Sequence, residues 1–191
     1  MKFSDETTMR LYRQTVEDFG LYTGKELSEE EMEGLRVSAG QMSAKMRAVR
    51  IVSASSVSKQ DLQHRLVQKG EDPEQARNAV QWMSELNLLD DARVAEQVVQ
   101  RCISKGYGLS RAKQALYEKR IPKQYWDAAL ENYPEQSERI EDFLKSRISA
   151  DSDAKEVKKA IDALMRRGHS YGAIRRAMNG LSFEAEEFPE E

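Results

Sequence analysis

The sequence of 191 residues contains one cysteine, two histidines and four prolines. Cys102 alone cannot form an internal disulfide, and its apolar helical position between Val98 and Ile103 predicts core packing rather than a catalytic thiol. No run of about 18 apolar residues could span a membrane, and the N-terminal MKFSDETTMR lacks the apolar stretch of a signal peptide. We therefore expect a cytoplasmic protein with no membrane contact.

Motifs for catalysis are missing as well. The sequence has no H-E-x-x-H, C-x-x-C, G-x-S-x-G or phosphate-loop pattern. Gly106-Tyr107-Gly108 looks like a fragment of a Gly-rich loop, but it follows a predicted helix rather than a strand. His64 and His169 stand beside arginines at helical or turn positions, which favours surface contacts over metal ligands or catalytic bases. We expect a protein that is not an enzyme and uses no cofactor or metal.

The charges are segregated along the chain, although the net charge is only -3 and the sequence pI is about 5.7. Residues 1–34 carry four basic and nine acidic side chains, and residues 184–191 carry five Glu and no basic residue. Each end thus holds a net -5, which leaves +7 for residues 35–183. A basic body favours binding to a polyanion or an acidic surface. Solvation of helix faces by Lys and Arg is the alternative.

One type of segment is written three times: an apolar helix end, a Gly or Ser turn, and a second helix with basic residues. The second helices start at Ser58, Gly108 and Ser170. Self-similarity of this kind predicts stacked helical units that bury their apolar faces against their neighbours. We expect an all-α fold of tandem three-helix repeats. The matching apolar columns are Val49, Val99 and Ile161; Val52, Cys102 and Leu164; Leu62, Ala112 and Ile174; and Leu66, Leu116 and Met178.

The N-terminal stretch differs from the repeats. Residues 8–12 favour a hairpin or lone strand, and a short helix near 15–19 should end at Gly20. Two strands at most are too few for an independent sheet, so we expect a small hairpin remnant that packs on the helices. Ser28 and Glu31 form a capping box, which predicts that the helical part begins near residue 29.

A long helix is predicted over residues 29–53, with a break near Gly34 or Gly40 because glycine is unfavourable inside helices. Ser58 and Asp72 are the predicted N-caps of the next two helices. Further helices are predicted over 92–105, 108–120, from Pro122 to before Pro134, 135–149, 154–167 and 170–179. The expected division is an acidic N-terminal extension over 1–34, repeats over 35–90, 91–134 and 135–182, and an acidic disordered tail over 183–191.

Basic and aromatic residues gather around the turns of the three copies. Flexible cations suit phosphate binding, and helix starts add a positive dipole end. Tyr107 and Tyr171 either stack on a base or partner or pack across the repeat interface, and we favour packing. The candidate binding set is Arg65, Lys69, Arg101, Lys105, Tyr107, Arg111, Lys113, Lys119, Arg120, Arg166, Arg167, His169, Tyr171, Arg175 and Arg176.

Three ordered motifs carry a family resemblance: LLDDARVA at 88–95, KGYG at 105–108, and RRGHSY at 166–171 with IRRA at 174–177. With them, roughly residues 40–180 resemble the RecX family of recombinase regulators. The resemblance implies a curved, elongated, right-handed-type array of three-helix repeats. It also implies a partner, the RecA recombinase polymerised on single-stranded DNA, whose groove the family occupies. Family members inhibit the ATPase, strand-exchange and co-protease activities of RecA in DNA repair and the SOS response, and they can also bind DNA.

Two functions are therefore compatible with the sequence. The leading hypothesis is a monomeric, non-enzymatic negative regulator of RecA filaments. The alternative is a stand-alone DNA-binding protein whose three-helix units act like helix-turn-helix modules. DNA affinity measured without RecA over a range of salt concentrations discriminates the two, because tight and sequence-selective binding with a steep salt dependence favours the second.

Overall fold

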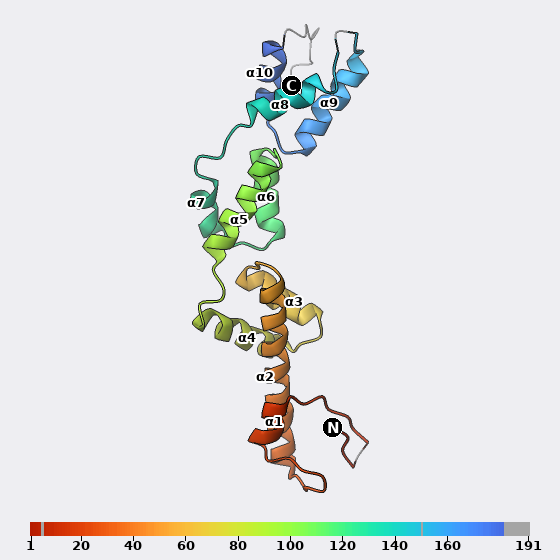
Figure 1. Ribbon diagram of the computed structural model, residues 1–191, viewed down its shortest axis with the longest axis vertical. Coiled ribbons are helices and arrows are strands. Elements are labelled where there is room, and N and C mark those ends of the chain that lie inside the picture. The colour runs from red at the N-terminus through yellow and green to blue at the C-terminus, as the bar shows by residue number, and fades with distance from the viewer. Residues whose placement is uncertain (5, 150, 182–191) are drawn as a thin grey trace. The chain divides into compact units, whose positions relative to one another are not determined.

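The computed structural model describes residues 1–4, 6–149 and 151–181, and every regular element within these ranges is a helix (Figure 1). The predicted all-α class is thus confirmed. The contacts divide the chain into two compact units, residues 1–91 and residues 92–191. Of the helices in the described ranges, none combines the length and the apolar character that a membrane crossing requires.

The first unit is built on one long helix, α2 (Glu29–Ala54). Helices α3 (Lys59–Gln68) and α4 (Pro73–Glu85) pack on its C-terminal half, and α1 (Arg13–Asp18) packs on its N-terminal half (Figure 1). Burying the apolar faces of these helices removes them from water and stabilises the unit. The core of α2, α3 and α4 comprises Ala44, Ala48, Val57, Leu62, Leu66, Ala76, Ala79, Val80, Met83 and Leu89.

The predicted helix starts of this unit are confirmed. The Ser28 hydroxyl accepts a hydrogen bond from the Glu31 backbone at 3.1 Å, and the Ser28 backbone N–H donates to the Glu31 carboxylate at 2.8 Å, which lowers the pKa of Glu31. Ser58 accepts from the backbone N–H of Asp61 at 3.0 Å. Asp72 accepts from the N–H of Glu74 at 2.8 Å, directly before the proline that opens α4.

The predicted break in α2 is wrong, because the helix runs through Gly34 and Gly40 without interruption. Both glycines lie where other segments pack on α2. A Cβ on Gly34 would lie 3.7 Å from the Phe19 ring, and one on Gly40 would lie 3.7 Å from Gln75 Cγ. These neighbours hold the helix together and offset the cost of about 1 kcal/mol that each glycine brings.

The expected strand over residues 8–12 is not formed. Lys2 and Thr8 make a single antiparallel bridge, and the N–H of Met9 donates to the carbonyl of Met1 at 2.9 Å. The hairpin stays this short because the described residues offer it no sheet to extend. The helix that follows, α1, begins at Arg13 and precedes Gly20, which has a φ of +53°.

The second unit contains α5 (Asp91–Ser104), α6 (Leu109–Glu118), a 3-10 turn η1 (Lys123–Tyr125), α7 (Trp126–Leu130), α8 (Ser137–Lys145), α9 (Ala154–Arg166) and α10 (Tyr171–Gly180). It has two apolar clusters. One joins α5 and α6 to the segment 121–133, and the other joins α8, α9 and α10. Ten of the twelve residues in the predicted apolar columns are buried in the two units; Val49 and Val52 are half-buried.

Three apolar clusters therefore occupy residues 44–89, 94–133 and 140–181. The repeat boundaries at residues 34, 90, 134 and 182 stay predictions, as do the curvature and handedness of the array. The predicted disordered tail, 183–191, lies outside the described residues.

Replacing Gly34 or Gly40 by Ala should stabilise the protein by about 0.5–1 kcal/mol at each site. Both added methyl groups meet ordinary van der Waals contacts, and alanine reduces the entropy lost when the helix forms. Urea unfolding of each variant measures the change. A loss of stability in both variants would contradict this prediction.

Candidate functional site

Two turns of the second unit are bonded directly to one another through their backbones. The N–H of Gly108 donates to the carbonyl of Arg167 at 2.9 Å, and the N–H of Ser110 donates to the carbonyl of Gly168 at 3.2 Å. We call residues 106–108 and 167–170 together the double turn. It brings the end of α5 and the start of α6 against the turn between α9 and α10, so it joins residues more than 50 positions apart in the sequence.

Glycine is required at two positions of the double turn. A Cβ on Gly108 would lie 2.1 Å from the carbonyl oxygen of Gly168, and a Cβ on Gly168 would lie 2.3 Å from the backbone nitrogen of Arg111. Gly168 also has a φ of +87°, which L side chains rarely adopt. The glycines thus permit close backbone contact between the α5–α6 turn and the α9–α10 turn. This contact gives the Gly-Tyr-Gly sequence a structural role that requires no bound nucleotide.

His169 is buried in the double turn, with 6% of its surface exposed, so the expectation of a surface contact is wrong. Its Nε2 lies 3.0 Å from the carbonyl oxygen of Gly106. Because a carbonyl only accepts, the ring nitrogen there carries the proton. Burial lowers the pKa of His169, and the positive charge of Arg167 lowers it further. His169 therefore holds the two turns together as a neutral donor.

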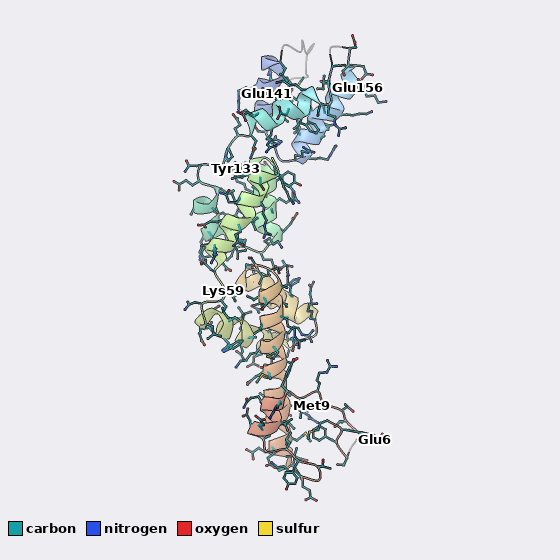
Figure 2. The ribbon with its side chains drawn as sticks, viewed as in Figure 1. Glu6, Met9, Lys59, Tyr133, Glu141 and Glu156 are labelled. Atoms are coloured by element: carbon teal, nitrogen blue, oxygen red, sulfur yellow. The ribbon has the colours of Figure 1, made fainter. Side chains whose placement is uncertain are left out.

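Two further side chains support the double turn, and both were missed from the sequence. The Tyr133 hydroxyl donates to the carbonyl of Tyr107 at 2.7 Å, and the Gln136 amide donates to the carbonyl of Ile103 at 3.1 Å. These bonds reach carbonyls at and just beyond the end of α5, where the Ile103 carbonyl also accepts from the backbone N–H of Gly106 at 2.9 Å. Burial raises the pKa of Tyr133 to about 12. Figure 2 labels Tyr133 on the segment that follows α7, and its position just before Pro134 was the sequence signal for a fixed turn.

Exposed cations surround the double turn. Arg101 and Lys105 lie at the end of α5, and Arg166 lies at the end of α9. Cations are favourable there because helix C-termini carry negative partial charge. The Arg167 guanidinium carbon lies 4.6 Å from the centroid of the Phe143 ring, which restricts its movement. The double turn therefore holds the charged ends of α5 and α9 together on one scaffold.

Other predicted arginines make internal ion pairs. Arg111 Nη1 lies 2.9 Å from a carboxylate oxygen of Glu118, and this hydrogen bond raises the pKa of Arg111. Arg176 pairs with Glu135. A carboxylate partner reduces the charge that each arginine offers to an external anion. Arg111 and Arg176 are therefore weaker candidates for binding than their exposed neighbours.

The remaining candidates of the second unit are more dispersed. Lys113 and Arg175 are exposed on α6 and α10, and Tyr171 is 39% exposed while Tyr107 is half-buried. Lys119 and Arg120 follow the last residue of α6, a helix of 10 residues and thus about 15 Å long. The structure places these two at the opposite end of α6 from the double turn.

In the first unit, Arg65 and Lys69 line a hollow of about 420 Å³ that we call the basic hollow. Arg47 and Arg50 of α2 line it too, with Ile51, Ala54 and Ser55. Both α2 arginines were missed because they lie before the Ser-rich turn rather than beside the second helix. Their spacing of three residues near the end of a predicted helix was the available signal.

The structure also describes the surroundings of the cysteine and of the metal-ligating residue types. No group of three or more His, Cys, Asp and Glu residues in the described ranges could hold a metal ion. Cys102 is buried, which confirms its predicted core packing, and burial raises the pKa of its thiol. A raised pKa keeps the thiol protonated and therefore unreactive.

The fold and the site together define an all-α protein of helical repeats in which glycine turns join neighbouring repeats and carry exposed cations. Residues 90–130 match the family model of RecX, second three-helix domain. The regulatory protein RecX of Stenotrophomonas maltophilia is 30% identical over 134 residues, which cover 69% of this chain and 82% of that protein. The chain belongs to the RecX family of regulatory proteins.

Two further similarities cover most of the chain. The regulatory protein RecX of Vibrio campbellii is 29% identical over 160 residues, which cover 80% of this chain and 98% of that protein. A crystal structure of a regulatory protein RecX covers 88% of this chain and 86% of its own, with a TM-score of 0.66 and 20% identity. That likeness supports the same fold.

Gly108→Ala should destabilise the protein by about 1–3 kcal/mol, because its methyl group has no space beside the backbone of Gly168. Urea unfolding measures the loss. Gly172→Ala is the matched control: its Cβ would lie 3.6 Å from Arg176 Nη1, and alanine inside α10 should be neutral or stabilising. Equal stability of the two variants would contradict the close contact of the turns.

Stability should fall as the pH is lowered from about 7.5 to 5.5, because unfolded His169 takes up a proton below its ordinary pKa of 6.5 while the buried ring resists protonation. Because folding lowers the pKa of His169, the stabilisation from this residue is complete above the ordinary pKa. This stabilisation is lost as the pH falls through the folded-state pKa. Chemical unfolding across this range measures it. His169→Gln should flatten the profile, whereas the exposed control His64→Gln should retain it; equal profiles for both variants would exclude His169 as the source.

Proposed function

We propose that this protein is a non-enzymatic negative regulator of the RecA recombinase, acting as a monomer in the cytoplasm. It binds in the groove of RecA filaments on single-stranded DNA and inhibits their ATPase, strand-exchange and co-protease activities in DNA repair and the SOS response. Membership of the RecX family supports this proposal. The observation that carries it is the double turn, which holds exposed cations of two helix ends on one scaffold.

A rigid scaffold suits binding to a polymer. Ordering flexible cations costs conformational entropy, and backbone bonds between the turns remove part of that cost before the partner arrives. Each cation contributes little alone, but several presented together convert weak contacts into one multivalent contact. A repeating filament offers the matching series of sites. The proposed mechanism is therefore occupation of the filament groove by this protein, which requires no cofactor.

A second candidate function is stand-alone DNA binding through helix-turn-helix-like units. The observation that favours it is the basic hollow, whose cations lie entirely within the first unit. Affinity for DNA without RecA, measured across salt concentrations, separates the two functions. Sequence-selective binding in the nanomolar range would favour the second function, and weak unselective binding would favour the first.

The regulator hypothesis predicts that substoichiometric protein lowers the DNA-dependent ATPase activity of RecA. Reversing Arg101, Lys105 and Arg166 to Glu should raise the concentration needed for half-inhibition by about tenfold or more, because three contacts become repulsive. The same triple variant should keep its helicity, since these side chains are exposed.

The matched control reverses Lys155, Lys158 and Lys159 to Glu. These lysines are exposed on the N-terminal part of α9 in the same unit, and the change in net charge is identical. The control should inhibit RecA nearly as well as the unchanged protein. Equal losses in both variants would mean that only total charge matters, and no inhibition at saturating protein would refute the proposed function.

A further inference from the structure

Large apolar side chains, as well as cations, are exposed around the double turn. Leu109 is 42% exposed and lies between the two residues whose backbone N–H groups bond to the other turn. Met165 is 50% exposed, and its carbonyl accepts from the N–H of Gly168. Tyr171, which opens α10, is 39% exposed. Exposed apolar groups beside cations are typical of a binding surface, and charge alone gives these three side chains no role.

Four exposed cations lie around the same turns and along α10. Arg101, Lys105 and Arg166 stand at the ends of α5 and α9, and Arg175 lies midway along α10. Within the described part of the chain, none of the four forms an ion pair with a carboxylate. Their charge is therefore available to an acidic partner. We call the three exposed apolar side chains together with these four cations the docking face.

The chain carries a segment of matching chemistry directly after α10. Residues 182–191, which we call the acidic segment, contain five Glu and no basic residue. Phe183 and Phe188 stand among these carboxylates. An acidic segment with two aromatic side chains complements a basic face with apolar side chains, both in charge and in hydrophobic character.

The acidic segment starts within reach of the docking face. Helix α10 runs from Tyr171, at the double turn, to Gly180 and is thus about 15 Å long. The residues of the acidic segment span up to roughly 33 Å when extended, so the segment can return from Leu181 along α10 to the double turn. Attachment to the same chain gives a local concentration on the order of millimolar, so weak contacts suffice for docking.

We propose that the acidic segment docks on the docking face of its own chain and covers the cations of the double turn. Its glutamates pair with the cations, and its phenylalanines pack on the three exposed apolar side chains. The same cations are the proposed contacts to the RecA filament, so the segment competes with the filament for them. This competition favours a filament, which offers many sites, over isolated acidic surfaces. The docking is independent of RecA, whereas its effect on inhibition rests on the proposed function.

Zero-length cross-linking of the full chain with a carbodiimide tests the docking, because this reagent joins a carboxylate to a lysine amine only where the two are in contact. Mass spectrometry compares links from the acidic segment to Lys105 with links to Lys155, Lys158 and Lys159, which are exposed on α9 in the same unit. At about 0.1 M salt, the Lys105 link should be about fivefold or more abundant than any link to α9. Equal yields would overturn the proposal.

The double variant Phe183→Ser with Phe188→Ser keeps every glutamate but loses the apolar contacts. Its Lys105 link should fall to the level of the α9 links. The matched control is Tyr22→Ser with Tyr117→Ser, two exposed aromatic residues of the first unit and of the far end of α6, and it should keep the preference for Lys105. Equal behaviour of the two variants would exclude the apolar part of the docking.

A mixture of isotope-labelled and unlabelled protein shows whether the two linked peptides come from one chain. Docking within one chain predicts Lys105 links in which both peptides are labelled or both are unlabelled. Lys105 links between a labelled and an unlabelled peptide would mean that the segment docks on a second copy of the protein. That result would overturn docking within one chain.

Inhibition of the RecA ATPase by the full chain tests the regulatory consequence. Replacing the five Glu of the acidic segment by Gln should lower the concentration needed for half-inhibition by about threefold or more, because the cations are no longer covered. A control with the same change in net charge should alter it by less than about twofold. Equal gains in both variants would overturn the regulatory role of the segment. The control replaces by Gln the exposed residues Glu6, Glu26, Glu29, Glu30 and Glu33.

The failure of this proposal is distinguishable from that of the proposed function. Cross-linking needs no RecA, so a lack of inhibition by the unchanged protein would refute the proposed function and leave the docking result intact. Intact inhibition without a preference for Lys105 would overturn the docking and leave the proposed function standing.

Discussion

The second unit depends on one close contact, in which the backbone between α5 and α6 meets the backbone between α9 and α10. The hydrogen bonds between the two turns join backbone N–H and carbonyl groups, so backbone atoms rather than side chains set the distance between the turns. Glycine at positions 108 and 168 allows that distance, and His169, Tyr133 and Gln136 satisfy carbonyls around it. This contact positions the helix ends that carry the exposed cations.

The same principle operates in the first unit with different chemistry. There, the carboxylate of Glu71, which lies before α4 and has low exposure, orients Arg47 of α2 beside a hollow. In both units, buried polar groups with partners fix the positions of charges at the surface. A regulator that acts by binding needs such fixed charges. Its affinity comes only from the part of the interaction free energy that exceeds the entropy cost of ordering its side chains.

Local features were predictable from the sequence. Ser28, Ser58 and Asp72 cap helices through bonds to residues two or three positions away, so their sequence signal is complete. Non-local features were not. Nothing near His169 indicates that its ring meets Gly106, 63 residues earlier, and nothing near Gly34 indicates that Phe19 packs on it. The Gly-Tyr-Gly turn was located correctly, but its partner was visible only in the fold. Two of the four cations of the basic hollow were predicted, because Arg65 and Lys69 flank a turn whereas Arg47 and Arg50 do not.

We propose that the double turn presents its cations to a RecA filament. Electron cryo-microscopy of this protein bound to RecA on single-stranded DNA tests it most directly. We expect Arg101, Lys105 and Arg166 to lie within contact distance of the filament, in its groove. A complex in which these three side chains face solvent, while other surfaces of the protein touch RecA, would contradict it.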